Sequence, residues 1–311
     1  MKVLLTGGSS FTGLWFARAL AAEGHAVTAT LLSPTDAYQG LRKQRAEALR
    51  DVAEVVHEVA FGSPAFLDLV QSSRFDLLCH HAAQVGDYRS PDFDVAGALQ
   101  ANTLRLRQVL EALRAGGAAG VVLTSSVFEA DEGVGPEPRE AFSPYGLSKT
   151  MTSAAFRFWC NRLSVPLGRF VIPNPFGPFE EPRFCDYLVR TWRAGEVPAV
   201  RTPLYVRDNI HVGALARAYA QFAGSMGTDP RPRKLAPSGY VESQGSFARR
   251  FAAEMSSRLD RELTVALGNQ TEFDEPAIRI NSDLIATICK DWAEAAAWDE
   301  VAEYYRRIYN I

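Results

Sequence analysis

Short runs of apolar residues alternate with stretches of helical periodicity over the first half of the chain. The runs are continuous rather than alternately apolar and polar, which is typical of strands buried on both faces of a sheet. They predict strands at Val3–Thr6, Ala26–Leu32, Glu54–Ala60, Phe75–His80, Gly120–Ser125 and Pro166–Ile172. Between them, apolar residues three and four positions apart predict helices at Leu14–Glu23, Tyr38–Arg50, Phe66–Gln71, Asp94–Gly116 and Pro144–Leu163.

This alternation with short turns predicts an α/β fold built on a doubly wound parallel sheet, the Rossmann arrangement. Ligands of such sheets bind at the carboxyl ends of the strands, so the residues just after each strand are the candidates for chemistry. From about Pro173 onward the regular alternation of predicted strands and helices ends, and helices such as Arg183–Ala194, Ser246–Arg258 and Glu300–Tyr309 occur with only brief strands. We expect residues 173–311 to form mainly a smaller substrate-binding lobe, with segments returning to the sheet.

A glycine-containing loop, Thr6-Gly-Gly-Ser-Ser-Phe-Thr-Gly13, joins the first predicted strand to the first helix. Gly7 permits a tight turn, Gly13 permits close packing of helix on strand, and the helix N-terminus attracts a pyrophosphate. The pattern predicts a dinucleotide-binding loop; the plain alternative is an ordinary strand–helix turn. Ser10 replaces the usual middle glycine, which is tolerable if its φ is negative, and its hydroxyl could bond a phosphate oxygen. The loop residues expected at the cofactor are Gly7, Ser9, Ser10, Phe11, Thr12 and Gly13, within a dinucleotide-binding domain of residues 1–172.

The end of the second strand bears on the choice of cofactor. An acidic residue there would hold the ribose 2′-hydroxyl of NAD. The chain instead has Leu31, Leu32 and Ser33, and its first acid is Asp36. Without a carboxylate a 2′-phosphate meets no repulsion, and donors to it could come from Ser33, Arg42 and Lys43. The sequence therefore favours NADP(H), with NAD(H) possible; the alternative for the two cations is a solvated helix face.

A tyrosine and a lysine lie four residues apart at Tyr145 and Lys149, on one face of a predicted helix. A free tyrosine has a pKa of about 10, and a nearby ammonium favours the phenolate, which suits proton exchange with a substrate oxygen. The plain alternative is a surface pair. Three hydroxyl residues, Thr124-Ser-Ser126, end the strand just upstream, and Ser126 is the best candidate to bond the substrate oxygen, with Ser125 and Thr124 as alternatives.

Asn102 lies within the long helix predicted after the fourth strand. Asparagine is disfavoured inside helices, so a specific role is indicated. It could hold a water or a backbone group on a proton path to Lys149; equally, it could be a buried polar residue satisfied by a neighbour.

Charge and cysteine content exclude several classes of function. The formal net charge is -3 and the pI is about 6.0, so the chain lacks the excess positive charge that attracts nucleic acid. No apolar stretch approaches the roughly 20 residues of a membrane span. The four cysteines, Cys79, Cys160, Cys185 and Cys289, are scattered, and no metal-ligand spacing occurs, so we expect no metal site and a cytoplasmic location.

Together these residues resemble the extended short-chain dehydrogenase/reductase family, in its NAD(P)-dependent epimerase/dehydratase branch. Three further motifs carry the resemblance, His80-His-Ala-Ala83, Pro173-Asn-Pro-Phe-Gly-Pro178 and Val206-Arg-Asp-Asn-Ile-His-Val212. The resemblance places Ala82, Ala83 and Pro173 at the cofactor. It assigns Asn174, Arg183 and Arg207 to a nucleoside-diphosphate sugar, and it implies a homodimer. The plain alternative for Arg207 is an internal ion pair with Asp208, and His211 is expected to be packed rather than catalytic.

The departures from the family narrow the reaction. Dehydratases of this branch carry an Asp-Glu pair directly after the catalytic hydroxyl residue, whereas Val127 and Phe128 follow Ser126, and Glu129, Asp131 and Glu132 are out of register. Our leading hypothesis is an NADPH-dependent reductase acting on the keto group of a nucleoside-diphosphate 4-keto-6-deoxy sugar. The rivals are a nucleotide-sugar 4-epimerase that retains NAD and a ketoreductase for a non-sugar metabolite.

Overall fold

The computed structural model describes residues 1–134, 140–227, 231 and 233–311. The chain divides into two compact units. Unit 1 comprises Met1–Glu132, Arg139–Ile172 and Ala216–Ala236, and unit 2 comprises Gly133–Pro138, Pro173–Leu215 and Pro237–Ile311.

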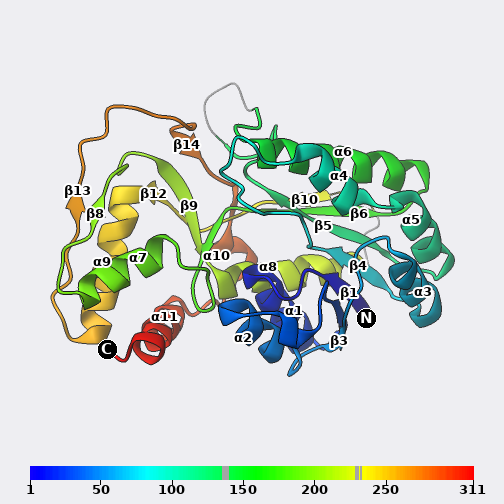
Figure 1. Cartoon of the computed structure of the whole chain (residues 1–311), viewed down its shortest axis with the longest axis horizontal. Helices are drawn as coiled ribbons and strands as arrows, with labels where there is room; N and C mark the ends of the chain where they lie inside the picture. The colour runs from blue at the N-terminus through cyan, green and yellow to red at the C-terminus, as the bar shows by residue number, and fades with distance from the viewer. Residues whose placement is uncertain (135–139, 228–230, 232) are drawn as a thin grey trace. The chain divides into compact units, whose positions relative to one another are not determined.

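Unit 1 is built on a seven-stranded sheet in the order β10-β6-β5-β4-β1-β2-β3 (Figure 1). Every neighbouring pair is parallel. The strands are β1 (Lys2–Thr6), β2 (Ala26–Thr30), β3 (Glu54–Val56), β4 (Leu77–His80), β5 (Gly120–Ser126), β6 (Leu167–Ile172) and β10 (Arg233–Leu235). The predicted doubly wound parallel sheet is confirmed. The chain order reverses between β1 and β4, so the carboxyl ends of these two strands flank the position where such sheets bind ligands.

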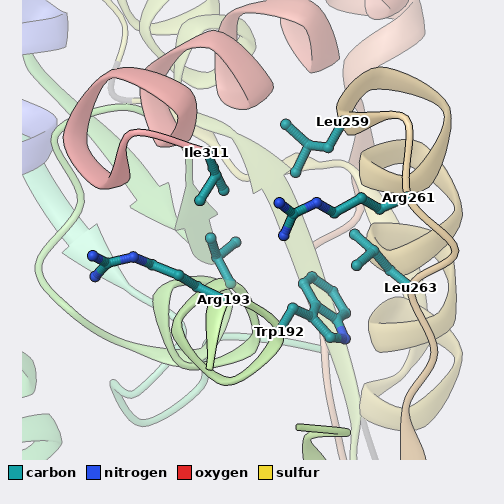
Figure 2. A pocket seen from close by; sticks show the side chains of 7 residues that line it. Trp192, Arg193, Leu259, Arg261, Leu263 and Ile311 are labelled. Carbon is teal, nitrogen blue, oxygen red and sulfur yellow. The ribbon is translucent and has the colours of Figure 1, made fainter. Parts of the chain in front are cut away.

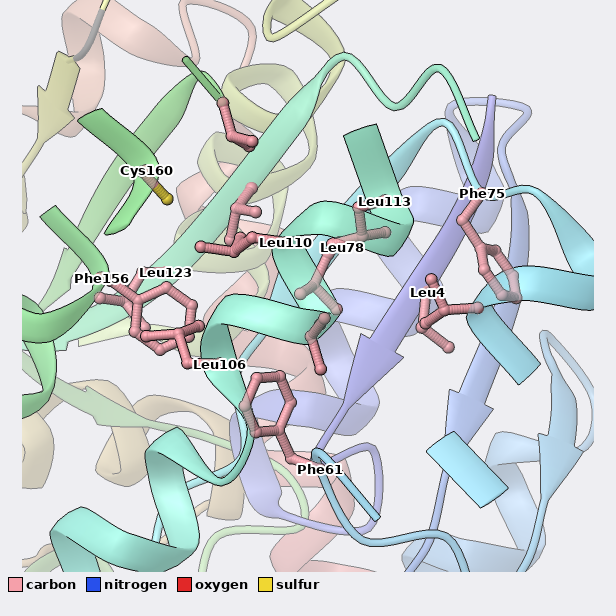
Figure 3. Packing of buried hydrophobic residues seen from close by; sticks show 14 of the residues in the cluster. Leu4, Phe61, Phe75, Leu78, Leu106, Leu110, Leu113, Leu123, Phe156 and Cys160 are labelled. Carbon is pink, nitrogen blue, oxygen red and sulfur yellow. The ribbon is translucent and has the colours of Figure 1, made fainter. Parts of the chain in front are cut away.

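Helices cover both faces of this sheet (Figure 1). On one face, side chains of α3 (Pro64–Ser73), α5 (Leu106–Ala115) and α6 (Pro144–Arg162) such as Phe66, Leu110 and Phe156 form one buried cluster with Leu78 and Leu123 of the sheet. Figure 3 shows part of this cluster, with Leu78, Leu110, Leu123 and Phe156 labelled. On the other face, Phe16 of α1 stacks on Tyr219 of α8 with ring centroids 3.9 Å apart. The helices of this unit are α1 (Phe11–Ala22), α2 (Gly40–Leu49), α3 (Pro64–Ser73), α4 (Val95–Thr103), α5 (Leu106–Ala115), α6 (Pro144–Arg162) and most of α8 (Val212–Ser225), with a 3-10 turn at Thr35–Ala37.

The single helix predicted at Asp94–Gly116 is wrong, because the chain leaves helical geometry between α4 and α5. Leu104 has a ψ of 123° and Arg105 has a left-handed φ of 46°. The guanidinium of Arg105 donates to the carbonyl of Gly62 at 3.0 Å. A distant part of the chain thus stabilises a break that local propensity does not encode.

The helix that carries the tyrosine–lysine pair begins at a well-formed cap. Ser143 is the N-cap of α6, and its hydroxyl accepts a hydrogen bond from the backbone N–H of Gly146 at 3.1 Å. Pro144 occupies the first turn, where its missing N–H is not needed. The start of α6 is therefore fixed one residue before Tyr145.

Unit 2 contains a small sheet centred on β9 (Val206–His211). β12 (Tyr240–Ser243) pairs antiparallel with β9, whereas β14 (Ile278–Arg279) and β7 (Asn174–Phe176) pair parallel with its beginning and its end. The other elements are α7 (Phe184–Arg193), α9 (Gln244–Leu259), α10 (Ile285–Ile288), α11 (Glu294–Tyr309), and the strand pairs β8 (Ala199–Val200) with β13 (Ala266–Leu267) and β11 (Pro237–Ser238) with β15 (Asp283–Leu284).

The core of unit 2 joins α7, α9 and α11 through side chains such as Trp192, Phe251 and Trp298. A small, mostly apolar pocket opens beside Trp192, flanked by Arg193, Arg261 and the C-terminal Ile311 (Figure 2). None of the residues that the sequence predicts for the site lines it. In the described part of the chain, no helix is both long enough and apolar enough to span a membrane.

Candidate active site

The loop after β1 has the backbone that a dinucleotide requires. Gly7 has a φ of +78°, and a Cβ on it would lie 2.8 Å from the backbone nitrogen of Ala82. A Cβ on Gly13 would lie 2.2 Å from the carbonyl oxygen of Gly7. Both positions therefore require glycine, and they leave backbone rather than side chains at the N-terminus of α1. This cradle fits a pyrophosphate.

Ser10 fits the loop because its φ is -78°, a value open to any residue. Its hydroxyl donates to the carbonyl of Gly7 at 2.8 Å and accepts from the backbone N–H of Gly13 at 3.1 Å. It also lies 3.0 Å from Nε2 of His81, as does the hydroxyl of Thr12. Since a hydroxyl has one proton to donate, this pattern assigns the imidazole proton to Nε2 and leaves Ser10 no donor for a phosphate. The hydroxyl thus serves the loop itself.

Two consecutive histidines after β4 tie the loop to the neighbouring strands. Nδ1 of His81 lies 3.1 Å from the hydroxyl of Thr124 at the end of β5. Nδ1 of His80 lies 3.0 Å from the hydroxyl of Thr6, and its Nε2 lies 3.2 Å from the carbonyl oxygen of Asn102. Burial, with a smaller contribution from the charge of Lys149, lowers the pKa of each histidine to about 3. Both imidazoles are therefore neutral near pH 7.

Two arginines of α2 brace the loop from the side. Nε of Arg42 donates to the hydroxyl of Ser9 at 3.2 Å, and its guanidinium lies 4.9 Å from the ring centroid of Tyr38. Nε of the buried Arg45 donates to the carbonyl of Ser9 at 3.1 Å. The backbone N–H of Ser33 donates to the hydroxyl of the same Tyr38. Ser33 and Arg42 thus meet at one side chain, and Lys43 follows on the exposed start of α2.

Lys149 is buried, with 4% of its surface exposed, and its ammonium donates to the carbonyl oxygen of Thr124 at 2.7 Å. Burial lowers the pKa of this lysine, and Glu129 opposes that shift. Tyr145 lies one helical turn earlier on α6 and is only partly buried. Its ring is surrounded by aromatic side chains, with centroid distances of about 6 Å to Tyr88, Phe93 and Phe128.

The three hydroxyls at the end of β5 differ in direction. Thr124 is engaged with His81, and the hydroxyl of Ser125 lies 3.3 Å from that of Ser153 inside the protein. Ser126 is the partly exposed member of the three, and its hydroxyl accepts from the backbone N–H of Phe128 at 3.2 Å. The two buried hydroxyls are committed to structure, which leaves Ser126 as the candidate for a substrate oxygen.

Asn102 is buried in α4 with 3% of its surface exposed. Its side-chain oxygen accepts from the backbone N–H of Gln84 at 3.0 Å, and its amide nitrogen donates to the hydroxyl of Thr152 at 3.3 Å. These contacts hold the segment after β4 against α6. They match both alternatives from the sequence, a backbone-holding residue and a satisfied buried amide.

In unit 2, Arg207 of β9 is held at three carbonyl oxygens, those of Val206, Pro276 and Ala277. It forms its ion pair with Glu275, at 2.9 Å. The alternative of an internal pair with Asp208 is wrong, because that buried carboxylate accepts from the backbone N–H groups of Gly239 and Asn281 instead.

The sequence reasoning missed Arg279, which stands opposite Arg207 in the parallel pair of β14 and β9. Its side chain is buried, and burial together with the charge of Arg207 lowers its pKa to about 10. Two guanidinium groups therefore lie at adjacent positions of this sheet. β14 is two residues long and its chain context shows no motif, so only the sheet register reveals the pair.

The remaining predicted residues of unit 2 lie on three segments. Pro173 and Asn174 are at the start of β7, and Arg183 is the residue that precedes α7. His211 is buried, packs against Phe176 and Trp292, and has a pKa lowered to about 4 by burial, which fits a packed histidine. Among the described residues no group of histidine, cysteine and acidic side chains could hold a metal ion.

Comparison with solved structures shows that several nucleotide-sugar enzymes share the fold of this chain. No curated protein was found to match the sequence. A UDP-glucuronic acid 4-epimerase from Bacillus cereus is 16% identical, with a TM-score of 0.74 over 99% of this chain and 100% of its own. A UDP-glucose 4-epimerase from Thermotoga maritima is 18% identical, with a TM-score of 0.73 over 99% of each chain. A dTDP-glucose 4,6-dehydratase from Streptomyces venezuelae is 15% identical, with a TM-score of 0.71 over 99% of this chain and 97% of its own.

The family itself is shown by sequence. A sequence model of the NAD dependent epimerase/dehydratase family matches residues 3–234, which include the loop after β1, the end of β5 and the Tyr145–Lys149 pair. The resemblance inferred from the motifs is confirmed, and the chain belongs to the NAD dependent epimerase/dehydratase family.

Proposed function

We propose that this protein interconverts nucleoside-diphosphate sugars that differ in configuration at one sugar carbon, as a 4-epimerase with a retained nicotinamide dinucleotide. The observation that carries the proposal is the arrangement at the end of β5. Lys149 is anchored to the carbonyl of Thr124, Tyr145 stands one helical turn away, and Ser126 keeps a partly exposed hydroxyl. A phenol, an ammonium and a hydroxyl at one strand end suit proton exchange at a sugar hydroxyl.

The cofactor would be held by the loop Gly7–Gly13, by Lys149, and by the segments after β4 and β6 that contain Ala82, Ala83 and Pro173. When bound, it supplies the hydride acceptor and donor that an alcohol–ketone interconversion requires. Tyr145 would take the proton of the substrate hydroxyl and return it to the same oxygen, so no proton is consumed. Ser126 would bond that oxygen, and the charge of Lys149 would favour the phenolate.

The support for a diphosphate substrate comes from unit 2. Arg207 and Arg279 stand at adjacent positions of the sheet register and their charges act on each other, so this edge concentrates positive charge that a multiply charged anion would favour. Asn174 and Arg183 are the other residues that we assign to the substrate. The Bacillus cereus enzyme is described in complex with UDP-glucuronic acid and NAD, and the Thermotoga maritima enzyme with UDP-glucose. A UDP-sugar is therefore the first substrate class to test.

A second candidate, the NADPH-dependent reduction of a keto sugar, is favoured by one observation. The end of β2 carries no carboxylate, and the exposed Arg42 reaches from α2 to the hydroxyl of Ser9 beside it. A 2′-phosphate would meet no repulsion at Ser33 and Arg42. The family description and the NAD-bound neighbours favour NAD, and for that reason we rank reduction second.

The two reactions differ in what happens to the cofactor. The purified protein is denatured, the released dinucleotide is identified by chromatography, and the native protein is assayed on a panel of UDP- and dTDP-linked sugars and keto sugars. Retained NAD with sugar interconversion and no net NADPH oxidation supports the epimerase. An empty protein that oxidises NADPH with a keto sugar supports the reductase. Turnover of a non-sugar ketone alone contradicts both.

We also propose a homodimer and a cytoplasmic location. Leu147, Met151, Ala154 and Phe158 of α6 form an exposed apolar stripe at helical spacing, which a second copy could cover. The four cysteines are buried free thiols, as a reducing compartment maintains them. Sedimentation of the wild-type protein and of Phe158→Glu tests the dimer; an unchanged dimer in that variant contradicts this interface.

A further inference from the structure

Glu129, in the turn after β5, is a buried carboxylate whose oxygens face the protein interior. Its side chain is 1% exposed. One oxygen accepts from the backbone N–H of Ser126 at 2.9 Å. The other accepts from the hydroxyl of Ser153 at 2.7 Å and from Arg169 at 3.2 Å. With both oxygens engaged and only 1% of its surface exposed, Glu129 cannot touch a substrate, so it cannot take the acid–base role of the dehydratase carboxylates.

The stability of the fold gives no sufficient reason for this charge. Arg169 is shared with a second buried carboxylate, Glu132, which also accepts from Lys234 at 3.0 Å. Burying such ion pairs costs about as much in desolvation as the attraction returns, and apolar side chains of similar size would serve as well. The placement of the Glu129 carboxylate beneath the strand end calls for another explanation.

Lys149 supplies that explanation, because it is a buried cation whose hydrogen bond goes to a neutral carbonyl. Burial disfavours its charged form. The Glu129 carboxylate accepts from Ser153, which lies one helical turn after Lys149 on α6, and its charge favours the ammonium, whereas the charge of Arg169 disfavours it. The charge of Lys149 in turn helps to keep both neighbouring histidines neutral. The titratable and charged groups that interact with the ammonium are Glu129 from the turn after β5, Arg169 from β6, and His80 and His81 at the end of β4. Tyr145 lies one helical turn earlier on α6.

We propose that Glu129 is a positioning residue of the active site, which holds the backbone of Ser126 from beneath and supplies the buried negative charge that keeps Lys149 an ammonium. The proposal rests on the proposed function for its consequence in catalysis, but the charge coupling itself needs no substrate. Glu132 is the matched control within the chain. It shares the partner Arg169 and is 3% exposed, and its carboxylate accepts from Arg169 and Lys234 rather than from Ser126.

The experiment titrates Lys149 directly in the substrate-free full chain. The sequence has five lysines, Lys2, Lys43, Lys149, Lys234 and Lys290, so the NMR signals of isotope-labelled lysine can be assigned by Lys149→Arg. In Glu129→Gln we expect Lys149 to lose its proton at a lower pH than in the wild type, and in Glu132→Gln at the wild-type pH. An unmoved titration in Glu129→Gln, or equal movement in both variants, overturns the proposal.

The catalytic consequence is read separately. In Glu129→Gln the fall of kcat/KM at alkaline pH should begin at a lower pH than in the wild type. For each pH unit of this shift, kcat/KM measured at a fixed pH within the fall is lower by about tenfold. A changed lysine titration with no measurable turnover of any nucleotide sugar would leave the charge coupling intact and contradict the proposed function instead.

The reciprocal variant guards against a Glu129→Gln protein that does not fold. The charge of Lys149 lowers the pKa of Glu129 against a larger upward shift from burial. In Lys149→Met we therefore expect the side-chain carboxyl signal of Glu129 to titrate at a higher pH than in the wild type. A Glu129 titration that is the same in both proteins contradicts the coupling.

Discussion

The hydroxyl of Ser10 and Nε2 of His81 lie 3.0 Å apart, and they link the loop after β1 to the end of β4. The other nitrogen of the same imidazole faces the hydroxyl of Thr124, whose carbonyl oxygen accepts from Lys149. Hydrogen bonds through His81 and the two oxygens of Thr124, side chain and backbone, therefore link the cofactor loop to the proposed catalytic lysine. The serine that departs from the glycine pattern is the first member of this series of contacts.

Removing the Ser10 hydroxyl should weaken cofactor binding as well as stability. In Ser10→Ala the cap of α1 and the bond to His81 are both lost, at a cost of about 1 kcal/mol for the cap. Ser63→Ala is the matched control, since Ser63 caps α3 in the same way, through the backbone N–H of Phe66 at 3.1 Å. Chemical denaturation should show a loss for Ser10→Ala at least as large as that for Ser63→Ala, whereas calorimetric titration with NAD, after removal of any retained cofactor, should show weaker binding for Ser10→Ala alone. Equal NAD affinity in the two variants would show that the Ser10 hydroxyl does not contribute to cofactor binding.

The depressed pKa of His80 should appear in the acid stability of the protein. Its folded pKa of about 3 lies below the ordinary value of 6.5, so the unfolded chain binds the proton first. The contribution of neutral His80 is present above pH 6.5 and is lost as the pH falls toward 3, by about 1.4 kcal/mol per pH unit. Between pH 6 and 4, the free energy of unfolding of His80→Asn should change less steeply with pH than that of the wild type. The difference in slope should correspond to about one bound proton. Identical slopes for the two proteins would show that His80 is protonated in the native state.

Substitutions of Tyr145 and Lys149 should differ in their effects on NAD binding. Tyr145→Phe removes only the phenol oxygen, so we expect kcat to fall by about 10²- to 10⁴-fold with unchanged NAD affinity. Lys149→Met should lower kcat and weaken NAD binding, and the free energy of unfolding should fall because the buried Glu129 carboxylate loses a positive charge that stabilises it. Stopped assays, calorimetry and denaturation together measure the three quantities. A Tyr145→Phe protein with near wild-type kcat would remove the tyrosine from the proposed chemistry.

The sequence predicts those parts of the molecule whose signals are local. The glycine loop, the start of α6 and the apolar strands lie within short windows, and the structure has them close to the predicted positions. The break at Arg105 depends on Gly62, 43 positions away, and no glycine or proline announces it. A turn after β5 directs the Glu129 carboxylate back to the backbone N–H of Ser126. The sequence could not predict this contact, because spacing along the chain does not show the direction of a side chain.

Arg207 illustrates the same limit in unit 2 and gives the last prediction. Its partner Glu275 is 68 positions away, so the sequence suggested the adjacent Asp208 instead. If Arg207 also binds a diphosphate, Arg207→Ala should lose a charge-assisted contact of about 1.5–3 kcal/mol, a roughly 10- to 150-fold weaker affinity for UDP. Arg250→Ala is the control, because Arg250 forms a comparable ion pair with Glu242 in the same unit and has no predicted role at the site. Calorimetric titration of both variants with UDP measures the difference.

Since Arg207 also holds the segment at Pro276 and Ala277, the stability of both variants is compared by denaturation first. A folded Arg207→Ala that binds UDP as well as Arg250→Ala does would leave Arg207 with a structural role only.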